Sequence, residues 1–484
     1  MHLQIEVVSA ECVWPSTRPD SPVSAPLSII DATVADFSPC QAVILFDANH
    51  DPNTSSRLTP DYLRSALQKT LEAYPQWCGR LHQSTYQPGT VPKSHTLRYG
   101  RLFLTYGRSD DPGALFIVAK ADRPLAELVP SGQESATRDA RTWNAANFPA
   151  AQLVSQAQLS TKNLDDPSLP SVVVQVTTFS CGGVAVALKF AHLLADAHCM
   201  ALFAQDWAAV SHALLAGTEL PHLSPLFDPQ SLDKHAAGNI DAPHPDSQLV
   251  AQAHSLPSHR YDWWISHHDC PYETRTKHIP MELPMVPHDP PGQRMSWSEW
   301  DVTAPVSHYV LHFSRNELDR LWKDVSAAAS IPLSRQDALL AHLWSCINRA
   351  RSPIFIAAIS TTGREAATGH PSKLASLIRS TVAVFTPENV AAHLHAKAYE
   401  QNPVRIWEAI LGRRHLLVTS WVHTGMHRVD FGTDTPRYVQ GAGSQDRRPV
   451  ARHGSAHGVD VQLYLATESM DRLLQNPAVR KYSD

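Results

Sequence analysis

The sequence predicts two α/β domains, each a mixed sheet with helices, joined by a long linker. The chain has 484 residues, more than one typical hydrophobic core holds, so two domains of roughly 200 residues each are expected. Strand-like apolar runs alternate with helical patterns in both halves. Prolines and histidines are dense in the middle of the chain, where both patterns stop. We therefore predict domains at 1–219 and 306–484 and a crossover linker at 220–305.

In the first half, a helix is expected after Thr59-Pro60, because a capping residue and a proline precede leucines at helical spacing. Strands are predicted at 77–81, 102–106 and 115–119. The β-branched run 171–179 and the apolar run 184–190 flank Gly182-Gly183, which predicts a hairpin. A helix with Phe203 and Trp207 on one face is expected over 199–214.

The second half repeats this alternation. Ser314 and Glu317 form a capping box before one helix, and Ser334 and Asp337 form a second cap that opens a helix carrying Leu339 to Ile347. The other predicted elements are strands at 307–313, 354–360, 382–385 and 459–465 and helices at 391–411 and 469–474.

Composition excludes several classes of function. The formal net charge is −5 and 18% of residues are charged, which gives no electrostatic reason to expect nucleic acid or an anionic membrane as a partner. No secretory leader or membrane-spanning segment is expected. The seven cysteines are scattered singly, as in a reducing compartment. We expect a cytoplasmic monomer.

His192-Leu-Leu-Ala-Asp196 lies where the 184–190 strand would end and the next helix begin. A neutral imidazole there can act as a general base on an incoming hydroxyl or amine. Asp196 would either orient His192 or pair with an arginine. Two other interpretations remain: a histidine satisfied within the core, and a metal site formed by His192, Asp196 and His198. We expect no metal, because the end of a strand and the start of a helix would spread three ligands apart.

A second group of residues follows Thr419-Ser-Trp421. Asp430-Phe431-Gly432 precedes Pro436 and is typical of a tight turn with a buried aromatic ring. Alone, this pattern indicates structure only.

With these two groups, the sequence resembles the BAHD acyltransferases, the coenzyme-A-dependent family within the chloramphenicol-acetyltransferase-like fold. His192 to Asp196 is similar to the family's HxxxD motif, and Asp430 to Gly432 to the start of its DFGWG-type motif. Further similar pieces, in the family's order, are Tyr74-Pro75, Gly79-Arg80-Leu81, Phe179 to Gly183, Pro225 to Asp228, 334–351, Gly363-Arg364 and Thr419 to Trp421.

The resemblance implies two chloramphenicol-acetyltransferase-like domains with a channel between them, His192 at its centre. Acyl-CoA would be the co-substrate and a small hydrophobic natural product the acceptor, with no bound cofactor. The resemblance also implies roles for other residues. Asp196 would point away from the acceptor and pair with Arg364, Trp421 would help to stabilise the oxyanion, Thr419 would contact the acceptor, and Asp430 would hold its turn.

The sequence departs from the family in places. Thr433-Asp434 replaces the tryptophan and glycine of the DFGWG-type motif, and Ala197 stands where glycine usually follows HxxxD. The predicted function is transfer of an acyl group from CoA to a hydroxyl, or less readily an amine, with His192 as the base. The alternatives are a condensing or cyclising enzyme that uses a carrier-bound acyl group, and a catalytically silent small-molecule binder. Acceptor, acyl chain and CoA-contacting residues are not specified by the sequence.

Overall fold

The structure is a computed structural model of the 484-residue chain. The residues it describes, to which all structural statements below refer, are 3–34, 39–48, 58–129, 141–145, 148–160, 166–257, 297–301, 303–350, 363–403, 416, 418–432, 436–441, 450–455 and 458–483.

The N-terminal half is built on a six-stranded sheet with the order β1-β6-β8-β9-β3-β12. Its strands are Ile5–Val13 (β1), Cys40–Phe46 (β3), Ala114–Ala121 (β6), Val172–Phe179 (β8), Val184–Phe190 (β9) and Tyr438–Gly441 (β12). The predicted hairpin is confirmed: β8 and β9 pair antiparallel, and Gly182 takes the positive φ of +86° that their turn requires. A smaller sheet of Val23–Pro26 (β2), Leu102–Tyr106 (β5) and Arg80–Gln83 (β4) lies beside it.

Helices cover both faces of the six-stranded sheet. Pro60–Thr70 (α1) and Ala197–Ala216 (α3) pack on one face, and the buried Trp207 of α3 donates its indole N–H to the Leu63 carbonyl of α1 at 3.1 Å. The short helix Ala150–Leu153 (α2) packs on the opposite face, against Val43 and Leu45 of β3. These layers bury β8 and β9 on both faces, which explains their nearly continuous apolar sequences.

The C-terminal half has its own core around a five-stranded sheet with the order β11-β13-β14-β10-β7. The strands are Thr142–Asn144 (β7), Val306–Ser314 (β10), Thr419–Ser420 (β11), Val450–Ser455 (β13) and Gly458–Ala466 (β14). The helices are Arg315–Ala327 (α6), Arg335–Ala350 (α7), Gly363–Thr368 (α8), Pro371–Ala383 (α9) and Thr467–Gln475 (α11). The capping box of Ser314 and Glu317 forms as predicted at the start of α6.

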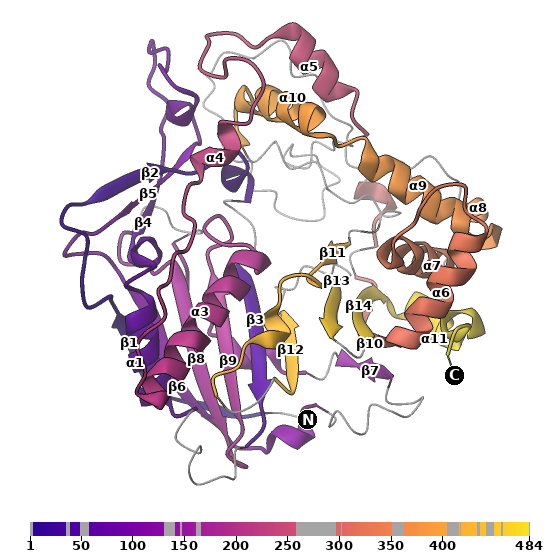
Figure 1. The fold of residues 1–484 in the computed structure, drawn as a ribbon, viewed down its shortest axis with the longest axis horizontal. Helices are drawn as coiled ribbons and strands as arrows, with labels where there is room; N and C mark the ends of the chain where they lie inside the picture. The colour runs from indigo at the N-terminus through magenta and orange to yellow at the C-terminus, as the bar shows by residue number, and fades with distance from the viewer. Residues whose placement is uncertain are drawn as a thin grey trace.

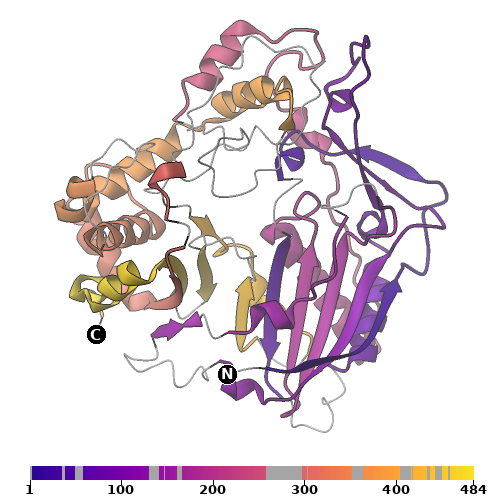
Figure 2. The same cartoon turned by 180° about the vertical axis from the view of Figure 1, so that it is seen from behind.

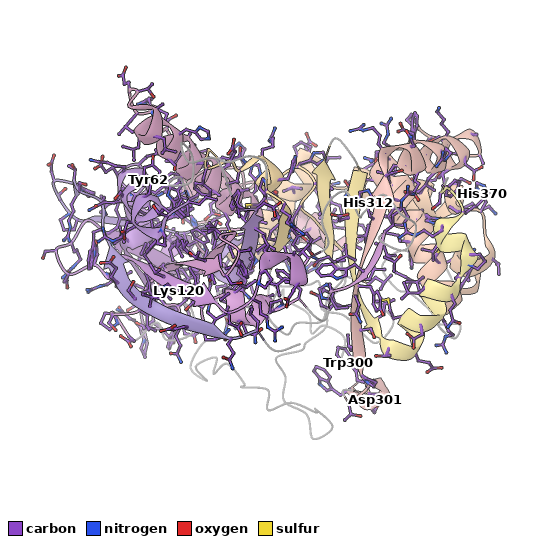
Figure 3. All side chains as sticks on the ribbon, turned by 90° about the horizontal axis from the view of Figure 1, so that it is seen from below. Tyr62, Lys120, Trp300, Asp301, His312 and His370 are labelled. Atoms are coloured by element: carbon purple, nitrogen blue, oxygen red, sulfur yellow. The ribbon has the colours of Figure 1, made fainter. Side chains whose placement is uncertain are left out.

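Each half contributes one strand to the sheet of the other. β7, from the first half of the chain, pairs with β10, and β12, from the second half, pairs with β3 (Figure 1). Figure 3 shows the two halves side by side, with Lys120 of β6 in one and His312 of β10 in the other. The domain boundaries at 219 and 306 stay a prediction. Each sheet, however, contains a strand from the other side of these boundaries.

The described part of the crossover carries two α-helices, Gln230–Asp233 (α4) and Ser247–His254 (α5), and a 3₁₀ turn at Trp297–Glu299. α5 packs on Pro387–Ala398 (α10), and both lie across one end of the molecule, as Figures 1 and 2 show. Gln252 of α5 donates to the Asn389 side chain at 2.9 Å. The crossover is therefore held against the C-terminal half at this end.

Some predicted elements differ from the structure. The strand predicted at 382–385 is wrong, since Val382 and Ala383 end helix α9; a four-residue apolar run does not distinguish strand from helix. The strand predicted at 77–81 begins late, because Pro75–Cys78 forms a 3₁₀ turn before β4. The helix predicted at 391–411 is α10, which begins earlier, at Pro387, and ends at Ala398, so residues 399–403 are not α-helical. The strand at 354–360 and residues 404–411 lie outside the described residues.

Helix α3 is, by length and composition alone, long and apolar enough to cross a membrane, contrary to the expectation that no segment would be. Half of its most apolar window is buried inside the protein, with Met200, Phe203 and Trp207 fully in the core. Core helices pass the same test, so this is weak evidence of a membrane span.

Candidate active site

His192 lies in a tight turn between β9 and α3. The amide of Ala191 donates to the Ser171 carbonyl at 2.9 Å, which keeps the chain beside β8, and the amide of Leu194 closes the turn on the Ala191 carbonyl at 2.9 Å. Ala191 and Leu193, on either side of His192, are buried in one apolar cluster. The backbone of His192 is thus fixed from both sides at the end of a central strand.

The imidazole of His192 is half-buried. Its Nδ1 is fully buried and has no hydrogen-bond partner in the structure. Buried polar atoms without partners are rare in folded proteins and call for a specific explanation, such as a catalytic role or a bound water. The unpartnered Nδ1 counts against the alternative of a histidine satisfied within the core.

Asp196 is the N-cap of α3. Its Oδ1 accepts hydrogen bonds from the backbone amides of His198 and Cys199, both at 2.9 Å. The side chain is exposed, and within the described residues it forms no ion pair. His192, Asp196 and His198 do not gather as metal ligands either, since the described residues hold no group of three side chains able to bind a metal ion.

The Cys199 thiol lies in the first turn of α3, next to this carboxylate. Burial, and then the negative charge of Asp196, raise its pKa to about 11. A thiol with this pKa is almost entirely protonated at neutral pH, so Cys199 is a poor nucleophile.

Thr419 and Trp421 lie where the chain passes from one half to the other. Thr419 is exposed on β11, paired with Val450 of β13. Trp421, half-buried, packs against the large core cluster of the N-terminal half, to which Ala195 of the His192 turn belongs and against which Leu194 also packs. Trp421 and the His192 turn therefore share one apolar cluster.

The following turn is fixed on α3. The Trp421 carbonyl accepts from the Thr424 amide at 3.1 Å, and Gln205 of α3 donates to the Thr424 carbonyl at 3.3 Å.

Asp430, Phe431 and Gly432 form the tight turn that leads toward β12. The Asp430 carboxylate accepts from the Gly432 amide at 2.7 Å, and Gly432 has a φ of +95°. Phe431 is fully buried, with its ring 4.9 Å from that of Trp207 and 5.7 Å from that of Phe46. The geometry is that of a structural turn.

A family model described as the Transferase family matches residues 3–257, which is more than half of the chain. This chain belongs to that family, the BAHD acyltransferases. It is an acyltransferase, and its two-domain α/β architecture is the chloramphenicol-acetyltransferase-like fold. The family resemblance noted in the sequence is confirmed.

Two fungal relatives match this BAHD acyltransferase over nearly its whole length. It is 27% identical to acyltransferase AFT15-1 of Alternaria alternata, covering 99% of this chain and 97% of the relative. It is 24% identical to acyltransferase abl6 of Leptosphaeria maculans, covering 99% and 98%.

Solved structures share the fold. The crystal structure of vinorine synthase matches with a TM-score of 0.54 at 16% identity, covering 98% of both chains. F. sporotrichioides TRI101, complexed with coenzyme A and T-2, matches with a TM-score of 0.60 at 13% identity, covering 95% of this chain and 99% of that one. A condensation domain of the calcium-dependent antibiotic synthetase matches with a TM-score of 0.52 at 14% identity, covering 95% and 96%.

Two predicted features of this acyltransferase lie outside the described residues. The Arg364 backbone begins helix α8, but its side chain is not described, so its pairing with Asp196 stays a prediction. Thr433 and Asp434, which replace the end of the DFGWG-type motif, are also not described.

Asp31 has no role in the sequence-based prediction, yet it lies near the HxxxD turn. It begins the 3₁₀ turn Asp31–Val34 and forms a reciprocal pair with Ser28: the Ser28 amide donates to its carboxylate at 2.9 Å, and its own amide donates to the Ser28 hydroxyl at 3.1 Å. Burial raises its pKa to about 6, with smaller contributions from the charges of Asp233 and Asp196. The Ser-x-x-Asp spacing was the available sequence signal.

Proposed function

We propose that this BAHD acyltransferase moves an acyl group from acyl-CoA to a hydroxyl of a small hydrophobic natural product, with His192 as the general base. The observation that carries the proposal is the half-buried imidazole at the end of β9, held by Ala191 and Leu193 and with Nδ1 buried and unpartnered. A rigidly held imidazole is the usual proton acceptor in such a reaction.

The comparisons support the two substrates. TRI101 structures are complexed with coenzyme A together with T-2 or deoxynivalenol, so proteins with this fold hold coenzyme A and a small molecule at once. Those ligands are properties of TRI101. For the present chain, acyl-CoA as donor and a natural-product alcohol as acceptor are the substrates that we propose.

In the proposed reaction, His192 takes the proton of the acceptor hydroxyl while its oxygen attacks the thioester carbonyl. The resulting tetrahedral oxyanion collapses, the carbon–sulfur bond breaks, and the imidazolium returns the proton to the departing CoA thiolate. The products are the ester and free CoA. A general base contributes about 10²- to 10⁴-fold in rate. No covalent acyl-enzyme is required, and the raised pKa of Cys199 argues against that residue as a nucleophile.

Trp421 and Thr419 complete the proposal from the second half of the chain. The indole N–H of Trp421 would donate to the oxyanion, which is worth about 10²- to 10³-fold per donor. Thr419, exposed on β11, would contact the acceptor. In support, Trp421 packs against the core cluster of the half that carries His192, as Leu194 of the His192 turn also does.

The test is release of free CoA thiol from a set of acyl-CoA donors incubated with small alcohols and amines, with product mass as confirmation. We expect turnover with at least one alcohol, and His192→Ala to lower kcat at least about 10²-fold with an unchanged fold. His198→Ala is the matched control, since His198 is exposed six residues further on and should leave kcat unchanged.

Other outcomes separate the alternatives. Product formed only from a carrier-bound thioester indicates a condensing enzyme instead. Saturable binding of acyl-CoA without product for any acceptor indicates a silent binder. Full activity of His192→Ala removes the base assignment.

A further inference from the structure

Asp233, in helix α4 of the crossover, is a buried carboxylate with donors on both of its oxygens. Only 3% of its surface is exposed. The amide of Ile29 donates to its two oxygens at 3.0 and 3.2 Å, and the imidazole Nε2 of His95 lies 3.1 Å from Oδ2. Gln230, one turn earlier, is 3.4 Å from the same oxygen. Hydrogen bonds to a buried carboxylate are charge-assisted and strong, so Asp233 holds the backbone amide of Ile29 in place.

The segment fixed by α4 is the stretch from Pro26 to Val34. The Gln230 amide donates to the carbonyls of Pro26 and Leu27 at 3.3 and 3.2 Å, beside the Asp233 bond to Ile29. Two side chains of one short helix thus bind the backbone of three residues, Pro26, Leu27 and Ile29. Because these hydrogen bonds go to backbone groups, they set the position of the segment independently of its side chains.

The His192 turn packs on this segment. Leu27 and Ala32 are buried in the same apolar cluster as Ala191 and Leu193, which flank His192. Ser28 and Asp31 lock the segment internally through their reciprocal hydrogen bonds. A displacement of the segment therefore moves the packing surface under His192.

We propose that Asp233 is a positioning residue for His192, acting through the Pro26–Val34 segment on which the His192 turn packs. The crossover then serves the reaction as well as joining the two halves. The inference rests on the proposed role of His192 as the base. Because the electrostatic effect of Asp233 also reaches the Asp31 carboxyl, loss of its charge should change the surroundings of the turn as well as its support.

The test compares Asp233→Asn with Asp241→Asn. Asp241 binds the other side of the same imidazole, with its Oδ1 2.8 Å from His95 Nδ1, but its side chain is 47% exposed. Its carboxylate accepts from the His95 amide and ring, and among the described residues no hydrogen bond joins it to the Pro26–Val34 segment. We expect Asp233→Asn to lower kcat by about 10- to 100-fold, the typical effect of displacing a reacting group by about 1 Å. The KM for acyl-CoA should stay within about twofold, and Asp241→Asn should leave kcat unchanged.

A milder variant guards against loss of the fold. Gln230→Ala removes the bonds to Pro26 and Leu27 while leaving the buried carboxylate in place. We expect its kcat to fall by about fivefold, in the same direction as that of Asp233→Asn.

A second readout needs no substrate. In protein labelled with ¹³C-histidine, the ring signal absent from His192→Ala identifies His192. We expect that signal, and its titration midpoint, to shift in Asp233→Asn and stay in place in Asp241→Asn. An unmoved His192 signal in Asp233→Asn, or equal loss of kcat in both variants, overturns the positioning role. Wild-type kcat in His192→Ala would instead overturn the proposed base, so the two failures are distinguishable.

Discussion

Asp196 Oδ1 accepts a hydrogen bond from the backbone amide of Cys199 at 2.9 Å, so the carboxylate of the HxxxD motif caps the helix that follows it. The His192 turn is therefore bounded by a strand on one side and a capped helix on the other. Asp196 can support His192 through the backbone alone, without contact with its ring.

This geometry predicts different effects for two substitutions of Asp196. Asparagine is as good an N-cap as aspartate, whereas alanine removes the cap and lowers the free energy of unfolding by about 1 kcal/mol. We expect kcat of Asp196→Asn to stay within about threefold of wild type and that of Asp196→Ala to fall further, measured beside chemical denaturation. If Asn loses as much activity as Ala, the negative charge is required, and pairing with Arg364 becomes the better explanation.

Phe431 is expected to be a major contributor to stability. It is fully buried between Phe46 and Trp207, and removal of such a ring leaves a cavity. Phe431→Ala should lower the free energy of unfolding by about 3 to 5 kcal/mol. Phe385→Ala is the control, because 44% of Phe385 is exposed and its loss should change stability little. Similar denaturation midpoints for the two variants would contradict the packing described.

The Asp31 carboxyl predicts a pH dependence of stability. Its pKa is raised from 3.8 to about 6 in the folded protein, so the folded state holds the proton more tightly than the unfolded chain. The resulting stabilisation is complete below about pH 4 and is lost as the pH rises through 6; its size is about 1 to 3 kcal/mol.

Asp31→Asn removes this titration. The free energy of unfolding of the variant, relative to wild type, should therefore increase between pH 4 and pH 7. Urea denaturation at the two pH values measures it, and a difference that is independent of pH would show that Asp31 titrates normally.

The Cys199 thiol should react slowly despite its exposure. With a pKa of about 11, its thiolate fraction rises about tenfold for each pH unit across the range from 8 to 10. Alkylation by iodoacetamide, followed at Cys199 by mass spectrometry, should rise in the same way. A plateau below pH 9 would indicate an activated thiol and reopen a covalent mechanism. Cys199→Ser should keep wild-type kcat.

Local signals predicted several elements well, among them the hairpin that leads to His192. Gly182-Gly183 between two apolar runs predicted the β8–β9 hairpin, and the Ser314 and Glu317 pair predicted the start of α6. Pairing between distant segments has no local signal, so the positions of β7 and β12 were not predictable. The strand predicted at 382–385 was wrong for a related reason: helix α9 continues through Ala383, and a short apolar run is compatible with either element.

The candidate site also has features that the sequence predicted and features that it did not. His192 at the end of a strand followed from the run 184–190, and the Asp430 turn from its sequence and the following proline. The capping role of Asp196 depended on where α3 begins, which the sequence placed at 199 rather than 197. The contact of Asp233 with Ile29 joins residues 204 positions apart, and no sequence pattern indicated it.

The exchange of β12 into the first sheet has a consequence for synthesis of the chain. β3 leaves the ribosome with its outer edge open, and the strand that closes it is made only when residue 441 has been translated. At roughly 5 to 20 residues per second, the edge stays open for about 20 to 80 s. During that time the unpaired edge of β3 is a binding site for chaperones. A chain truncated before residue 438 would keep this edge unpaired and prone to aggregation.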